Sequence, residues 1–286
     1  MSTKLKFCVP AEYDGCLVKV FLRSFCRVSA HLLVKLKRTP EGITCNGKHI
    51  RAIDTLNTGD IVELCLPEDE NAIPSLSIPL KILYEDEHIL IVDKPPFLPV
   101  HPVHGHIDDT LANAVAAYFR SKGENHTFRA INRLDKDTSG IVLLAKDSYT
   151  AALLHKHVQK TYMAVCEGVL TGNGTIDEPI RLMEGHSIQR EVGEGGARSI
   201  THWKAIKNNN EFTLLEINLE TGRTHQIRVH FSYLGYPLAG DDMYGGKQNC
   251  INRHALHCSS ISFIHPVSGK TIEITSNIPD DMQSLI

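Results

Sequence analysis

The chain has 286 residues, 42% of them hydrophobic, and a formal net charge of −3 at pH 7. A chain of this length can bury a full core and form one large or two modest domains. No stretch approaches the roughly 18 apolar residues that a membrane span requires, and the first residues lack the apolar core of a secretion signal. The 8 cysteines include no C-x-x-C pair, as expected of reduced thiols. These features predict a cytoplasmic protein that does not enter membranes.

Residues 1–70 are predicted to form a small domain of two helices and a hairpin-like sheet. Apolar residues recur at helical spacing between positions 17 and 36, and Ser29 is placed to cap the second helix. Asn46-Gly47 predicts a tight hairpin turn, and residues 59–66 alternate as a strand. Residues 1–40 hold eight basic and two acidic side chains, a net of +6. This charge suits a phosphate-binding face, and ordinary solvated helix faces explain it equally well.

Residues 67–74 are acidic and bounded by proline, which predicts a linker, placed at 71–79. From residue 80 to residue 286 the composition predicts a second, larger domain of strands and helices. Its expected elements are a buried strand at 88–92, a helix beginning near Asp109, a helix capped by Ser148, and strands at 201–205 and 212–219.

The segment from Arg133 to Ile141 places two carboxylates and an arginine in a polar loop that leads into an apolar strand. Loops held by a rigid strand often carry catalytic groups. An aspartate can serve as a nucleophile or base when a nearby cation keeps it ionised in a partly dry pocket. From spacing alone, Asp135 and Asp137 could equally cap the turn before the strand.

A second polar segment, residues 221–230, reads as a glycine turn followed by a helix that ends at Gly235. Arg223 and Arg228 are expected near the helix start, away from its apolar stripe, and a solvated helix start would explain Arg223 and His230. Three apolar side chains are expected to face the core: Ile227, Phe231 and Leu234. Between the two polar segments, Tyr162 lies in an alternating strand, where a tyrosine is usually part of the core.

These three segments together resemble the signature of the RluA-type RNA pseudouridine synthases. The matching letters are R-L-D-x-x-T-S-G at 133–140, the tyrosine after Lys160, and G-R-T-H-Q-I-R at 222–228, and the resemblance extends from about residue 82 to residue 274. It implies an α+β fold with a mixed, largely antiparallel central sheet. The opening domain more loosely resembles the αL RNA-binding motif that often precedes the catalytic domain in this family.

The resemblance also implies roles for individual residues. Asp135 takes the catalytic position, Tyr162 stacks on the uridine flipped out of the RNA, and Arg228 pairs with the aspartate. Arg133 enters the RNA stack as the uridine leaves. The family usually has histidine before the R-L-D letters, where this chain has Asn132. The substrate-binding residues expected from the same motifs are Arg133, Leu134, Thr138, Arg223, His225 and Gln226.

The implied reaction breaks the bond from ribose to the base nitrogen and rejoins the base through carbon, which requires no metal or redox cofactor. The implied partner is RNA, with ribosomal RNA favoured over transfer RNA, and the chain is expected to be a monomer. One alternative is an RNA-binding protein that keeps the fold without the chemistry. Another is a metal-dependent hydrolase prompted by His101, His104 and His106 and by His254 with His257, although a proline-interrupted loop gives the first three no fixed ligand geometry.

Overall fold

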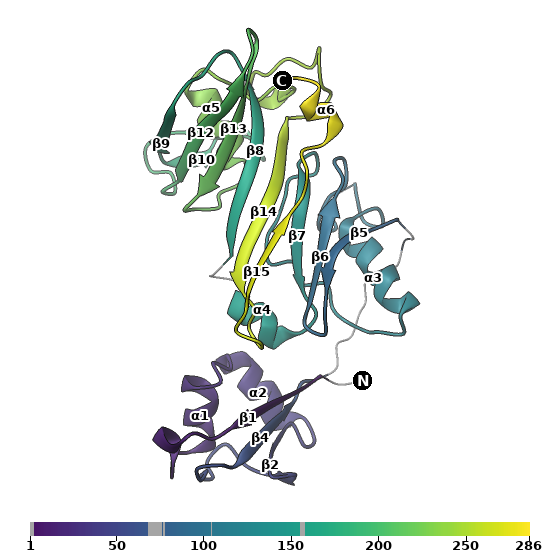
Figure 1. Cartoon of the computed structure of the whole chain (residues 1–286), viewed down its shortest axis with the longest axis vertical. Coiled ribbons are helices and arrows are strands. Elements are labelled where there is room, and N and C mark those ends of the chain that lie inside the picture. The colour runs from purple at the N-terminus through teal and green to yellow at the C-terminus, as the bar shows by residue number, and fades with distance from the viewer. Residues whose placement is uncertain (1–2, 68–75, 77, 104, 155–157) are drawn as a thin grey trace.

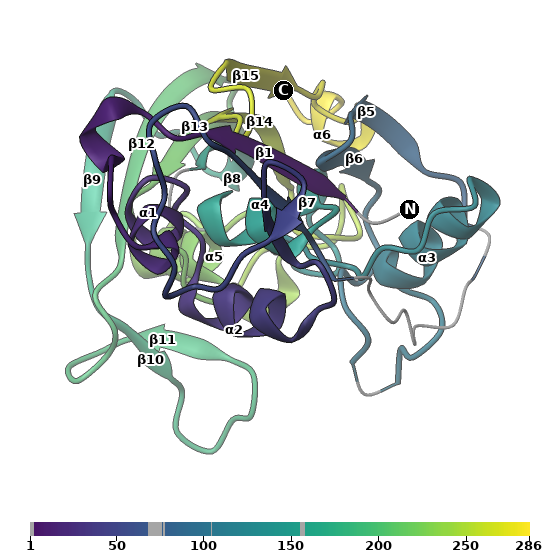
Figure 2. The ribbon, with the colours of Figure 1, turned by 90° about the horizontal axis from the view of Figure 1, so that it is seen from below.

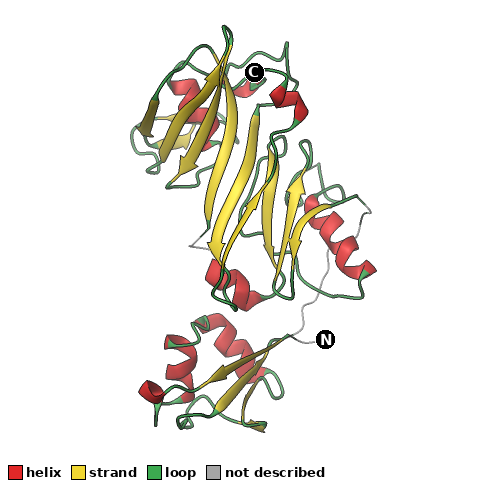
Figure 3. Cartoon of the chain, viewed as in Figure 1, coloured by secondary structure: helices red, strands yellow, loops and turns green. Residues whose placement is uncertain are grey.

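The computed structural model describes residues 3–67, 76, 78–103, 105–154 and 158–286, which form a small N-terminal domain and a larger domain built on one long sheet (Figure 1). Strands dominate the larger domain, whereas the small domain combines helices with a small sheet (Figure 3). In the predicted linker at 71–79, residues 71–75 and 77 lie outside the described residues. Among the helices described, none combines the length and apolarity that crossing a bilayer demands.

The small domain packs two helices on a four-stranded sheet of order β1-β4-β2-β3. The predicted cap is confirmed, since the Ser29 hydroxyl accepts a hydrogen bond from the Leu32 amide at 3.1 Å. The predicted hairpin turn is also confirmed, because Asn46 and Gly47 both have positive φ, 49° and 77°. The first strand was not predicted. The elements are β1 (Lys4–Cys8), η1 (Ala11–Tyr13), α1 (Val18–Ser24), α2 (Ala30–Arg38), β2 (Ile43–Cys45), β3 (Lys48–His49) and β4 (Ile61–Cys65).

The larger domain is built on a nine-stranded sheet of order β5-β6-β7-β14-β8-β13-β12-β9, with β15 paired to β14. Only the β7–β14 pair is parallel, so the predicted mixed, largely antiparallel sheet is confirmed. Its strands are β5 (Lys81–Glu85), β6 (Ile89–Lys94), β7 (Ser139–Ala145), β8 (Gln159–Glu167), β9 (Asn173–Asp177), β12 (Ile200–Asn208), β13 (Phe212–Leu219), β14 (Leu256–Ile264) and β15 (Thr271–Thr275).

The remaining elements lie around this sheet. A separate hairpin of two short strands projects from the body beside α5 (Figure 2). It consists of β10 (Ile180–Leu182) and β11 (Arg190–Val192). The helices are α3 (Leu111–Ser121), α4 (Ser148–Leu154), α5 (Gln226–Tyr233), η2 (Asp242–Tyr244) and α6 (Asp280–Gln283).

A single glycine allows strands β7 and β14 to pair at the centre of the sheet. The parallel contact is short, pairing His257 with Ser139 and Cys258 with Gly140. Gly140 has φ of 113°, and a β-carbon there would collide with the Cys258 carbonyl oxygen. Only glycine therefore lets β14 lie against the start of β7, and this contact brings the loop before β7 to the middle of the sheet.

Helix α4 of the larger domain packs against the small domain. Ser148, predicted to cap this helix, is instead its first residue. The Asp147 carboxylate takes the capping role, accepting hydrogen bonds from the Thr150 amide at 2.7 Å and the Thr150 hydroxyl at 2.8 Å. Tyr149 packs in the core of the small domain and donates its hydroxyl proton to the Cys26 carbonyl at 2.9 Å. In Figures 1 and 2, α4 faces the small domain accordingly.

Candidate active site

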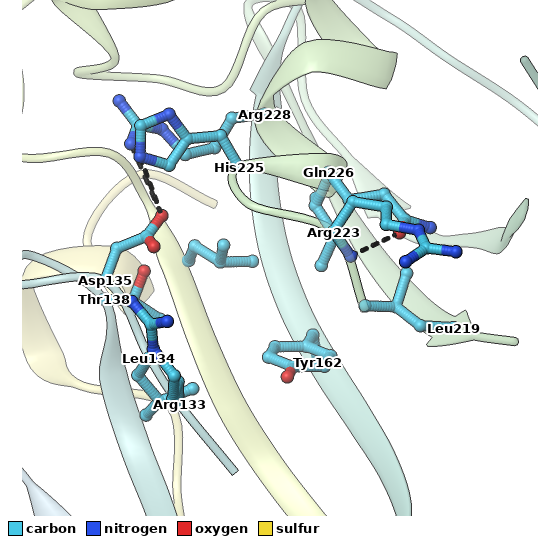
Figure 4. Close-up of a pocket in the computed structure, with 12 residues that line it drawn as sticks. Arg133, Leu134, Asp135, Thr138, Tyr162, Leu219, Arg223, His225, Gln226 and Arg228 are labelled. Atoms are coloured by element: carbon cyan, nitrogen blue, oxygen red, sulfur yellow. Dashed lines mark hydrogen bonds and ion pairs between the residues drawn. The ribbon is translucent and has the colours of Figure 1, made fainter. Parts of the chain in front are cut away.

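Three separate parts of the chain meet at one pocket: the loop before β7, strand β8, and the turn that leads into α5 (Figure 4). The pocket encloses about 390 Å³ of atom-free space, including its open mouth. All nine residues that the motifs indicate line it. The full lining is Arg133, Leu134, Asp135, Thr138, Tyr162, Leu219, Arg223, His225, Gln226, Ile227, Arg228 and Leu256.

The loop that carries Asp135 is held by a buried lysine that the sequence motifs did not identify. Lys94 is only 1% exposed, and its ammonium donates to the carbonyls of Pro95 and Leu98 at 2.8 Å and of Lys136 at 2.9 Å. Burial lowers the pKa of Lys94 to about 7, although the nearby carboxylates oppose this shift. The lysine therefore ties the backbone beside Asp135 to the end of β6.

Asn132, which stands where the family usually has histidine, holds the other side of the loop. This buried side chain donates to the Ile141 carbonyl at 2.9 Å and accepts from the Leu143 amide at 2.9 Å. The amide thus pairs with both kinds of backbone group on β7, as a neighbouring strand would. Asparagine is well suited to this position because its side chain carries both a donor and an acceptor.

The ion pair expected between Arg228 and Asp135 is present, with Nη1 3.4 Å from Oδ2. A stronger pair lies behind it: Arg228 donates to both carboxylate oxygens of Asp241 at 2.7 Å. Burial opposes the charge of Arg228, but the hydrogen bonds and charge of Asp241 outweigh it and raise the pKa of this guanidinium. Asp241 therefore orients the arginine that faces Asp135.

His225 also faces the Asp135 carboxylate, with its ring nitrogen Nε2 3.8 Å from Oδ2. Its backbone is left-handed, with φ of 57°. The Tyr244 hydroxyl accepts from the Arg190 amide at 2.9 Å, so its own proton is available to His225 Nδ1, also 2.9 Å away. This arrangement leaves the imidazole proton on Nε2, toward Asp135. Burial lowers the pKa of His225, although Asp135 opposes the shift, and the neutral ring is favoured.

Tyr162 projects from β8 into the pocket (Figure 4) and is 7% exposed. It pairs across the sheet with Cys258, and its hydroxyl hydrogen-bonds that thiol. Burial raises the pKa of the Tyr162 phenol well above its ordinary value, and the Cys258 and Asp135 charges add to the effect. The ring is therefore a neutral aromatic surface at physiological pH.

Helix α5 differs from its prediction in two respects. Leu234, expected to face the core, is 38% exposed. Arg228, expected to pair with Asp135, is also buried, and Asp241 satisfies its charge. His230, expected to be solvated, is fully buried between the Thr201 hydroxyl at 2.8 Å and the Glu178 carbonyl at 3.0 Å. Arg223 remains exposed at the pocket mouth, as predicted.

Gln226 lines the pocket with an amide that is committed to the protein. Its nitrogen donates to the Ile200 carbonyl at 2.9 Å and the Thr201 hydroxyl at 3.0 Å. Its oxygen accepts from the Arg223 amide and the Thr221 hydroxyl, both at 3.0 Å. The side chain therefore joins the turn before α5 to strand β12 and sets the position of the helix start.

His254, considered from the sequence only as a candidate metal ligand, lies directly behind the loop. Its Nε2 lies 2.7 Å from the Thr138 hydroxyl oxygen. Burial, reinforced by the positive charges of Arg228 and Arg253, lowers the pKa of His254 to about 2, so the ring is neutral. The available signal was modest: His254 and Asp241 both lie in the stretch after α5 where the family resemblance continues, without a motif that marks either residue.

The histidines considered as metal ligands are engaged in other contacts. His106 Nδ1 lies 2.6 Å from an Asp109 carboxylate oxygen, and His101 packs edge-on against the Phe128 ring with centroids 5.1 Å apart. His104 lies outside the described residues. Within residues 3–67, 76, 78–103, 105–154 and 158–286, no three His, Cys, Asp or Glu side chains are grouped to hold a metal ion.

The chain is similar to known RNA pseudouridine synthases. A family model described as RNA pseudouridylate synthase matches residues 88–233. The chain is 37% identical over 267 residues to an uncharacterized RNA pseudouridine synthase, YjbO, of Bacillus subtilis, covering 91% of this chain and 94% of that protein. It is 38% identical over 264 residues to the ribosomal large subunit pseudouridine synthase D of Xanthomonas campestris, covering 84% and 79% of the two chains.

A solved structure titled human RNA pseudouridylate synthase domain containing 1 matches with a TM-score of 0.59 and 26% identity, covering 74% of this chain and 89% of that chain. The extent of these matches, together with the residues gathered at the pocket, shows that the chain belongs to the RluA-type family of RNA pseudouridine synthases, which are isomerases.

Proposed function

We propose that this enzyme isomerises specific uridines of ribosomal RNA in the cytoplasm, acts as a monomer, and uses Asp135 as its nucleophile or base. The observation that carries the proposal is the meeting of Asp135, Tyr162 and Arg228 at one pocket. The preference for ribosomal over transfer RNA draws on the relatives named as ribosomal large subunit pseudouridine synthase D, which are 34–38% identical to this chain.

The pocket suits a uridine that has left its helix. An extruded base loses the stacking of its neighbours, and an aromatic side chain can replace that contact. Tyr162 offers this surface, and its raised pKa keeps the ring uncharged. In the role that we assign to it, Arg133, which is exposed at the pocket mouth, takes the place that the uridine leaves in the RNA stack.

The charges suit a reactive carboxylate. The Asp135 side chain is 31% exposed, so it can reach a ribose, and Arg228 Nη1 lies 3.4 Å from its carboxylate. An ionised aspartate could attack the ribose carbon as the bond to the base nitrogen breaks, or it could remove a ribose proton. In both routes the bond from the ribose to the base nitrogen breaks, the base turns, and its carbon bonds to the ribose. That carbon loses its proton and the freed nitrogen gains one, so the reaction is a net isomerisation. In the first route the base carbon displaces Asp135 from the ribose, and in the second Asp135 returns the proton that it removed.

The test is pseudouridine formation in total RNA that lacks the modification, mapped at nucleotide resolution, with the pure full-length chain and with Asp135→Asn. The proposal expects new pseudouridine in ribosomal RNA with the unaltered chain and none with the variant. Asp137→Asn is the matched control on the same loop and should retain activity. Modification confined to transfer RNA would overturn the substrate assignment, and equal activity of Asp135→Asn would overturn the role of Asp135. If neither the unaltered chain nor Asp135→Asn formed pseudouridine, an RNA-binding role without catalysis would be favoured.

A further inference from the structure

A second groove lies near the catalytic pocket. It encloses about 710 Å³ of atom-free space, including its open mouth. The groove lies between the β10–β11 hairpin, α5 and η2, and the hairpin projects from the body at this point (Figure 2). Its lining is Met183, Gln189, Arg190, Glu191, Val192, Val229, Ser232, Tyr233, Met243 and Tyr244.

Tyr244 lines the groove and contacts two residues that line the catalytic pocket. Its ring lies under the Arg228 guanidinium, whose carbon is 5.0 Å from the ring centre, and its hydroxyl contacts His225. On the groove side, the same hydroxyl accepts from the Arg190 amide at 2.9 Å. The groove therefore lies within one side chain, that of Tyr244, of the pocket residues His225 and Arg228.

Arg190 gives the groove an unused cationic donor. Its Nε is buried and has no hydrogen-bond partner among the described residues. A buried guanidinium nitrogen without an acceptor is costly, so an incoming acceptor would be bound strongly. Glu191, the acidic residue of the lining, is already paired with Arg181 at 2.8 Å. The guanidinium of Arg190 is thus suited to an anionic oxygen such as that of a phosphate.

The opposite wall offers a surface for a base. Tyr233 is 56% exposed and Met243 is 37% exposed, and both line the groove. Below them Ile180, Val229 and Tyr244 form a small buried cluster, so this wall has a packed support. Exposed aromatic and thioether side chains on a firm base are suited to stacking by a nucleobase of any sequence.

From this geometry we propose that the groove binds the nucleotide next to the target uridine in the same RNA strand, with its phosphate on Arg190 and its base against Tyr233. The inference rests on the proposed function, because it takes the strand to be the one whose uridine occupies the catalytic pocket. It assigns to the β10–β11 hairpin a part in holding the RNA strand beside the modified uridine.

The experiment measures affinity of the full chain for a labelled oligouridylate, and for a stem-loop that carries the mapped uridine, by fluorescence anisotropy at low salt. Arg190→Gln should bind both RNAs about tenfold more weakly. Arg190→Lys keeps the charge and should recover most of the loss, which excludes misfolding of the hairpin as the cause. The matched control is Lys204→Gln, which removes one exposed positive charge from β12 outside the groove and should bind as the unaltered chain does.

A single neutral methylphosphonate in the stem-loop, at the linkage beside the target uridine, locates the contact. It should weaken binding by the unaltered chain about tenfold and have little further effect on Arg190→Gln. Equal binding by Arg190→Gln and Lys204→Gln would overturn the proposal, as would a methylphosphonate effect of the same size in both proteins. Because anisotropy reads binding without turnover, a chain that binds oligouridylate normally but forms no pseudouridine would overturn the proposed function alone.

Discussion

Replacement of Asp241 by asparagine tests whether the buried carboxylate behind Arg228 supports both the fold and the chemistry. The carboxylate receives two hydrogen bonds of 2.7 Å from the guanidinium, and its side chain is fully buried. Asparagine keeps the shape and one acceptor but loses the charge. Truncating one partner of a buried ion pair typically costs about 3–5 kcal/mol. Because one acceptor remains, we expect Asp241→Asn to lower the free energy of unfolding by about 2–3 kcal/mol.

The same change should slow catalysis at temperatures where the protein stays folded. Arg228 would be free to turn away from Asp135, and losing about 1.4 kcal/mol of transition-state stabilisation would reduce the rate tenfold. Unfolding can be followed in urea by the fluorescence of Trp203, the single tryptophan of the chain. This ring packs against Phe231 of α5, with centroids 6.3 Å apart, so it reports the element that carries Arg228.

Asp242→Asn is the control, because it removes the same charge from the adjacent, exposed position. Its unfolding midpoint and its rate should match those of the unaltered chain. The reasoning would be refuted if Asp241→Asn unfolded at the same urea concentration as Asp242→Asn. It would also be refuted if Asp241→Asn were destabilised but kept its full rate, because Asp241 would then support the fold without positioning Arg228.

Three further predictions concern the surroundings of the pocket. His254 has its folded pKa lowered to about 2 against an ordinary 6.5, so the unfolded chain takes up the proton first as pH falls below about 6.5. The contribution of His254 should therefore lower the free energy of unfolding by about 1.4 kcal/mol for each pH unit below that point. Urea titrations at a series of pH values from 7 downward should show that the free energy of unfolding depends less steeply on pH in His254→Asn. Lys94→Met removes three hydrogen bonds that hold the loop and should reduce the turnover rate. Lys136→Met, at an exposed position, is the control and should keep the rate of the unaltered chain. Equal turnover rates of the two variants would count against the role of Lys94. Deleting residues 1–70 should weaken RNA binding more than it slows the chemical step, and it should make the affinity less dependent on salt. If the truncated chain bound RNA as tightly and with the same salt slope, the small domain would not be an RNA-binding domain.

Local pattern was sufficient for most of the elements. The cap at Ser29 and the Asn46-Gly47 turn were predicted because their geometry depends on residues next to one another. The strand β1 was missed because it is short, and pairing with β4, more than fifty residues away in sequence, holds it in place. Local preference does not register a partner so distant in the chain.

Helix α5 shows where local pattern failed. Its spacing placed Leu234 inward, and a solvated helix start would have explained His230. In the structure His230 is buried, as is Arg228, because Thr201 and Asp241 supply the partners that make their burial tolerable. Whether a charged side chain can be buried depends on groups contributed by other elements, and helical periodicity contains no information about them.

The sequence by itself determined the family resemblance, the sheet class and the residues at the pocket, because motif letters and alternating patterns are properties of the chain. Only the tertiary structure revealed that Asp241 orients Arg228, that Lys94 holds the catalytic loop and that Arg190 keeps an unpaired nitrogen beside the groove. These relations join segments that are distant in sequence. Their energies depend on distance and burial, which exist only once the chain has folded.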